Sequence, residues 1–166
     1  MTIFIKPTTA HHATYYILAK FDEHIPILER VVFANDESEI IPFINEFNPR
    51  DDDRIMFDGT TYVQTGIDLR RATDRDIFIY RDRSDGNTNH KLCVSVSNEI
   101  AAQSRWIAAN MQYSITMKND PHFQRFIQLM TDYSPTNPNC DSTAAELMAA
   151  AARYFRRVYD VDNNLE

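Results

Sequence analysis

Glycine is scarce in this chain, and only Gly59, Gly66 and Gly86 occur among its 166 residues. Loops that cradle phosphate need clustered glycines, because these let several backbone amides approach the ligand closely. Neither a Walker loop nor a dinucleotide-binding fingerprint can be assembled from three scattered glycines. The composition therefore argues against ATPase, GTPase and Rossmann dehydrogenase functions.

Cysteine, long apolar runs and positive charge are also in short supply. Cys93 and Cys140 are far apart and lack zinc-ligand spacing, so we expect reduced thiols in a cytoplasmic protein. No run reaches the roughly 18 apolar residues that a membrane-spanning helix needs, and the first residues lack the pattern of a signal peptide.

The formal net charge of −7 disfavours general attraction to nucleic acid or to an anionic membrane. We expect no cofactor.

The residues that are present divide the chain in two. Residues 1–96 have the pattern of strands separated by turns, and residues 97–160 have an almost wholly helical pattern. This order predicts a single α+β domain over residues 1–160, followed by a frayed polar tail over residues 161–166. We expect a mainly antiparallel sheet of about five strands, packed on one face by the C-terminal helices.

Several local signals place the elements within this fold. Strands are expected over residues 2–6, 12–21 and 25–33, and a helix after Ser38 has apolar residues at helical spacing from Ile40 to Phe47. Asp58-Gly59 predicts a hairpin that joins residues 55–57 to residues 60–63. A second hairpin is expected over residues 76–96.

The second part of the chain begins with a helix near Ser97. Asp120-Pro121 predicts the start of another helix, since proline is favoured at the first helical position. Thr143 and Glu146 have the spacing of a capping box at the start of the last helix. The apolar faces of the last two helices serve either the core or a homodimer.

The run Asp51, Asp52 and Asp53 is the first candidate site. Hard cations such as Mg²⁺ prefer carboxylate oxygens, so this loop is an alternative metal site for phosphoryl chemistry. Three adjacent carboxylates in an extended loop point in different directions, however, and the sequence identifies no distant partner. A solvated loop without metal is the preferred interpretation.

Arginines and aromatic residues alternate in the middle of the chain and form the second candidate. They define a candidate binding surface of Arg70, Arg71, Arg75, Tyr80, Arg81 and Arg83. Such residues suit single-stranded RNA, because bases stack on aromatic rings and arginine binds phosphate. Interleaved aspartates cancel the positive field, so exposed Arg–Asp pairs of little energetic consequence are the preferred interpretation. A protein-binding surface is the next alternative, ahead of nucleic acid.

His12-Ala13-Thr14 is the third candidate. It matches one His-x-Thr element of the kind used by two-histidine phosphoesterases, whose chemistry needs two such elements. No other histidine in the chain repeats the element. His12 and Thr14 therefore serve only an alternative, catalytic interpretation.

The sequence favours a non-enzymatic binding or regulatory protein that acts through protein–protein contact. A small phage or viral accessory protein would fit these features. One alternative is a phosphodiesterase or nuclease that uses His12 or the Asp51–Asp53 loop. A second alternative is a single-stranded RNA binder that uses the arginine and aromatic residues of the middle segment.

Overall fold

A mixed β-sheet runs through the centre of the protein. The computed structural model describes residues 1–8, 14–22, 27–60, 62–81, 112–113, 117–134, 137 and 139–164. Within these residues the sheet has six strands in the order β5-β4-β1-β2-β3-β6. The strands are β1 (Thr2–Pro7), β2 (Tyr16–Phe21), β3 (Ile27–Ala34), β4 (Arg54–Asp58), β5 (Ile77–Tyr80) and β6 (Gln112–Tyr113).

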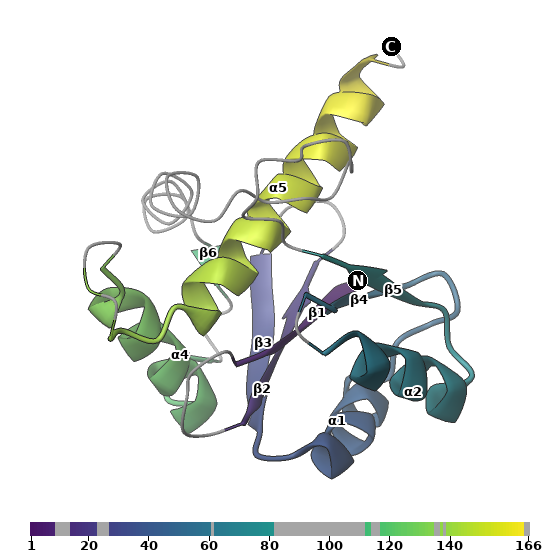
Figure 1. Cartoon of the computed structure of the whole chain (residues 1–166). Helices are drawn as coiled ribbons and strands as arrows, with labels where there is room; N and C mark the ends of the chain where they lie inside the picture. Colours follow the sequence, from purple (N-terminus) through teal and green to yellow (C-terminus); the bar gives the residue numbers. More distant parts are fainter. Residues whose placement is uncertain are drawn as a thin grey trace.

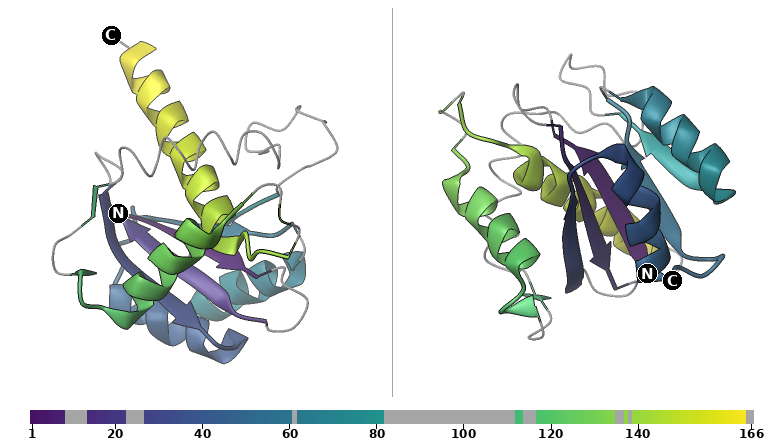
Figure 2. Two further views of the ribbon diagram at one scale, coloured as in Figure 1. Left: turned by 90° about the vertical axis from the view of Figure 1, so that its left-hand side faces the viewer. Right: turned by 90° about the horizontal axis from the view of Figure 1, so that it is seen from below.

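Helices cover both faces of this sheet. A short 3-10 turn (Glu37–Glu39) leads into α1 (Ile40–Phe47), which with α2 (Val63–Thr73) lies on one face. On the other face lie α4 (Pro121–Asp132) and α5 (Thr143–Asn164). Figure 1 shows α5 crossing the sheet, and Figure 2 shows the two pairs of helices on opposite sides of the strands.

Strand alternation divides the apolar residues between two cores. In β1, Ile3 and Ile5 pack on the side of α1 and α2, while Phe4 packs on the side of α5. Both faces of the central strands are therefore buried, as expected for strands with apolar residues at nearly every position. Lys6 follows Phe4 by two residues and so points toward α5.

The α+β class predicted from the sequence is confirmed, but the sheet is mixed. Strands β1, β2 and β3 pair antiparallel, whereas β1–β4, β4–β5 and β3–β6 pair parallel. Parallel neighbours arise because a helix lies between β4 and β5 in the chain, which returns the second strand in the same direction. The C-terminal helices cover one face as expected, and α1 and α2 cover the other.

The hairpin predicted at Asp58-Gly59 is wrong. After Gly59 the chain enters α2 instead of returning as a strand. The scarce glycines explain how closely α2 packs: a Cβ on Gly66 would lie 2.8 Å from Cδ1 of Phe57, and one on Gly59 would overlap Ile79. A larger residue at position 66 would push α2 away from β4 and β5, and one at position 59 would displace the side chain of Ile79.

The other local predictions have separate outcomes. The helices expected from residue 40, from Pro121 and from Thr143 are present, although Asp36, not Ser38, caps the turn before α1. The strand at residues 77–80 is confirmed as β5. The second half of that hairpin, the helix near Ser97 and the end of the polar tail at residues 165–166 lie outside the described residues.

Candidate binding site

A buried ion network joins the carboxyl ends of β1 and β4 to the first turn of α5. The Nζ of Lys6 lies 2.5 Å from Oδ2 of Asp58 and 3.1 Å from Oε2 of Glu146. Lys6 and Asp58 are 3% and 4% exposed. Burial alone would lower the pKa of Lys6, but the two carboxylates outweigh this effect and raise its pKa above the ordinary 10.5.

Hydrogen bonds satisfy the remaining carboxylate oxygens of the network. Oδ1 of Asp58 accepts from the backbone N–H of Thr60 at 3.0 Å and from its hydroxyl at 2.6 Å. Oε1 of Glu146 accepts from the hydroxyl of Ser142 at 3.1 Å. Every carboxylate oxygen therefore has a donor, which is what a stable buried charge requires.

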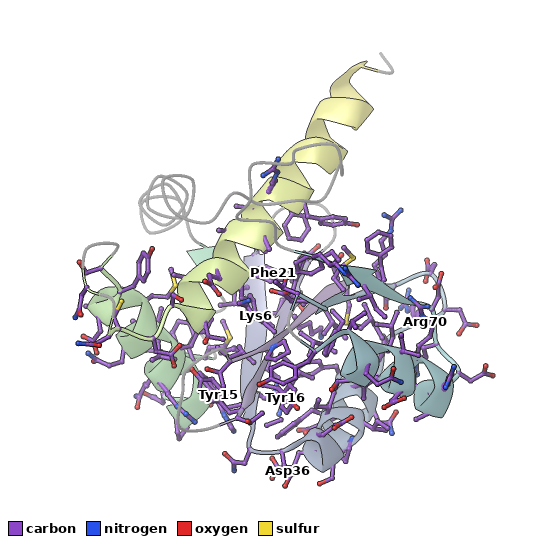
Figure 3. All side chains as sticks on the ribbon, in the orientation of Figure 1. Lys6, Tyr15, Tyr16, Phe21, Asp36 and Arg70 are labelled. Atoms are coloured by element: carbon purple, nitrogen blue, oxygen red, sulfur yellow. The ribbon has the colours of Figure 1, made fainter. Side chains whose placement is uncertain are left out.

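A second set of hydrogen bonds joins the start of α5 to Thr8 and to Tyr15, the residue before β2. Oδ1 of Asp141 accepts from the backbone N–H of Thr143, and so caps the start of α5. Oδ2 of Asp141 accepts from the hydroxyl of Tyr15. The hydroxyl of Thr143 also donates a hydrogen bond to the hydroxyl of Thr8 at 3.1 Å. Burial and the Asp141 hydrogen bond raise the pKa of Tyr15 to about 12. Figure 3 labels Lys6 and Tyr15 beneath the first turns of α5.

These contacts give the network a structural role. A lysine whose pKa is raised stays protonated at neutral pH and so cannot serve as a nucleophile or a general base. Its two carboxylates are already occupied by donors from the chain itself. The network fixes the N-terminus of α5 against the sheet.

A pocket of about 450 Å³ opens at the opposite, amino ends of β4 and β5. We call it the β4–β5 pocket. It is lined by Asp51, Asp52, Asp53, Arg54, Ile55, Met56, Asp76, Phe78 and Tyr154. The parallel register that pairs Met56 with Phe78 brings the two preceding loops together. The guanidinium of Arg75 also joins these loops, because it donates to the carbonyl of Pro49 at 3.0 Å.

Among the described elements, none covers the corner of the sheet at Phe78. Phe4, Met56 and Phe78 form a row across β1, β4 and β5 on the face that α5 packs against. Phe4 and Met56 are 1% and 4% exposed, whereas Phe78 is 49% exposed. The ring of Tyr154 packs on Phe4, with centroids 5.7 Å apart, and so forms the wall between α5 and the open corner.

The aspartates of the predicted solvated loop, the alternative metal site, line this pocket. Asp53 is engaged: its Oδ1 lies 2.7 Å from the N-terminal ammonium of Met1, and its Oδ2 accepts from the backbone N–H of Arg50. Asp51, Asp52 and Asp76 are exposed. Across the described part of the chain, no three histidine, cysteine, aspartate or glutamate side chains are grouped so as to hold a metal ion.

The arginine and aromatic residues predicted as a binding surface do not share one environment. Tyr80 is 5% exposed and belongs to the core. The side chain of Arg70 connects α2 to β5, since its Nε and Nη2 donate to the carbonyl of Ile77 at 3.0 and 2.7 Å. Arg71 and Arg81 are exposed. Arg83 lies outside the described residues.

The histidine motif is described only at its end. Thr14 is exposed, and His12 lies outside the described residues. Sequence reasoning missed Lys6 and Glu146, although a lysine within an apolar strand is a signal of a buried partner. It also missed Phe78 and Asp76, because their meeting with the Asp51–Asp53 loop depends on the parallel pairing of β4 and β5.

Comparison of the chain with protein-family models, with curated proteins and with solved structures gives no match. Among the helices that the structure describes, none combines the length and the apolar character needed to cross a membrane. The function must therefore be argued from the site itself.

Proposed function

We propose that this protein is a non-enzymatic binding protein that regulates a partner by protein–protein contact through the β4–β5 pocket. The observation that carries the proposal is the exposed ring of Phe78 beside a pocket of about 450 Å³. A single exposed apolar residue means little by itself. An aromatic ring next to a concave site is typical of the anchors that dominate binding at protein interfaces.

The polar residues support binding over catalysis. The most deeply buried charged group, the Lys6 network, is satisfied within the chain and fixes α5 in place. Asp53, the last of the three aspartates that precede β4, is held by Met1 and Arg50. Neither cluster has the arrangement of a positioned acid and base that proton-transfer chemistry needs.

Affinity capture with matched variants tests the proposal. The wild-type protein, Phe78→Ser and Ile67→Ser would each be immobilised and exposed to lysate of the native host. Ile67 lies on α2, on the face of the sheet opposite to the β4–β5 pocket. Its substitution is therefore a control for the loss of an apolar side chain away from the pocket. We expect one partner in stoichiometric amount on the wild type and on Ile67→Ser, and much less on Phe78→Ser.

Two results would contradict the proposal. Equal recovery of the partner on Phe78→Ser would show that the β4–β5 pocket is not the contact. The enzymatic alternative has its own assay, in which the protein is incubated with Mg²⁺ or Mn²⁺ and labelled RNA, DNA or cyclic nucleotides. Turnover that disappears in Asp52→Ala would replace binding with phosphodiesterase or nuclease activity.

A further inference from the structure

We infer that the β4–β5 pocket binds an arginine-rich segment of a protein partner, an inference that rests on the proposed function. The charge of its lining is the first reason. Asp51, Asp52 and Asp76 are exposed around it, and Arg54 is the basic residue among the lining side chains. Four aspartates and one arginine line the pocket, so the formal charge of its lining is negative and suits a cation.

The available carboxylates favour arginine as the contacting residue. Among the described residues, no ion pair involves Asp51, Asp52 or Asp76, whereas Asp53 is paired with Met1. An exposed carboxylate can accept two parallel hydrogen bonds from one guanidinium. A lysine ammonium is a compact charge that cannot make this bidentate contact.

The apolar part of the lining provides the second, independent reason. Phe78 on β5 and Tyr154 on α5 are aromatic residues of the lining, and Met56 on β4 adds a third apolar side chain. A guanidinium stacks on an aromatic face while its edge donates to carboxylates. A simple metal ion would use the carboxylates and leave this aromatic surface without a role.

The pocket is also large enough for a peptide side chain together with part of its backbone. Its volume of about 450 Å³ falls within the usual range of ligand sites. The formal net charge of −7 acts at longer range and increases the rate at which a basic partner arrives. Both effects weaken as salt is added.

A labelled peptide of alternating arginine and glycine is the probe, with citrulline replacing arginine in the neutral control peptide. Fluorescence anisotropy would measure the affinity of the intact protein for each peptide. We expect the arginine peptide to bind, to weaken with salt, and to bind about tenfold less tightly to Asp52→Asn/Asp76→Asn, because rim charges contribute modestly. The citrulline peptide should not bind.

Asp68→Asn/Asp132→Asn is the matched control, since it removes the same formal charge elsewhere. Both control aspartates are exposed and accept a hydrogen bond from a neighbouring glutamine, which asparagine can also accept. Full affinity in this variant supports the inference. Equal weakening in both double variants would overturn it, because the attraction would then come from net charge alone. Binding of the citrulline peptide, or no binding by the wild type, would also overturn it.

The failure of this inference can be separated from that of the proposed function. If partner capture depends on Phe78 but not on Asp52 and Asp76, the binding function stands and the arginine inference is wrong. If the arginine peptide binds but no partner is captured, the preference of the pocket for arginine stands and the proposed binding function is wrong. Sedimentation at several concentrations adds a further outcome: self-association that Phe78→Ser abolishes would assign the pocket to a second copy of this chain.

Discussion

Lys6 and Asp58 occupy adjacent positions on the parallel strands β1 and β4, and their ammonium and carboxylate groups meet inside the core at 2.5 Å. Glu146 reaches the same ammonium from α5 at 3.1 Å. The three groups connect the start, the middle and the end of the chain at one point. Their effect on stability is large when one partner is removed, because the others are then left charged and buried.

Lys6→Met removes the ammonium and keeps an unbranched side chain. We expect the free energy of unfolding to fall by about 3–5 kcal/mol, since the buried carboxylate of Asp58 and the half-buried one of Glu146 lose their counter-ion. Urea unfolding monitored by circular dichroism would measure this loss. The triple variant Lys6→Met/Asp58→Asn/Glu146→Gln has no buried charge at this point and should recover much of the stability. Equal stability of Lys6→Met and the wild type would show that the network contributes nothing.

Alkaline pH should weaken the fold through Lys6 and Tyr15. The pKa of Lys6 is raised above 10.5, and that of Tyr15 is raised from 10.0 to about 12. A raised pKa in the folded state gives stability that is complete below the unfolded value and is lost as the pH rises through the folded value. The free energy of unfolding should therefore decline from about pH 10 to about pH 12. Tyr15→Phe should show a shallower decline, and an identical profile would contradict this assignment.

Gly66→Ala tests how tightly α2 packs on the sheet. Alanine in an exposed helix normally stabilises by about 1 kcal/mol relative to glycine. Here the added Cβ would lie 2.8 Å from Phe57, so we expect destabilisation of about 1–3 kcal/mol from overpacking. Ala72→Gly, at an exposed position of the same helix, is the control for intrinsic propensity and should cost about 1 kcal/mol. Thermal unfolding of both variants decides the sign.

His122 connects α4 to the C-terminal end of β3. Its Nδ1 accepts from the backbone N–H of Phe33 at 3.0 Å, and its ring stacks on the ring of Phe33. His122→Phe keeps a ring but removes the acceptor, so we expect a loss of about 1–3 kcal/mol from the unsatisfied buried amide. Hydrogen exchange at the Phe33 amide should become faster in this variant. Unchanged exchange at that amide would contradict the role assigned to the imidazole.

The sequence was most informative where the signal was local. Asp120-Pro121 begins α4 as predicted, because a capping side chain and a preset φ angle act on adjacent residues. The buried face of α1 at Ile40 and Ile44 follows from helical spacing alone. Asp58-Gly59 was misleading, because the same two residues suit a hairpin turn and a strand-to-helix loop.

The candidate site depended on contacts that no local pattern contains. The exposure of Phe78 follows from where α5 crosses the sheet. The sequence does not mark it, because residues 77–80 are uniformly apolar. Asp76 joins the Asp51–Asp53 loop only because β4 and β5 are parallel and in register. The ion network of Lys6 depends on two partners from distant parts of the chain. The spacing of Glu146 from Thr143 predicts only a capping box, not a contact with Lys6.

The contact between Lys6 and Glu146 also constrains the order of events during synthesis. Strands β1, β2 and β3 form a meander of neighbouring antiparallel strands, which is available early because its pairings are local. The carboxylate of α5 arrives only when the last helix has been made. Until then, the nascent chain presents the apolar side of Phe4 and Phe21 to its surroundings without the helix that later buries it. We therefore expect the chain to be most prone to aggregate before Thr143 leaves the ribosome.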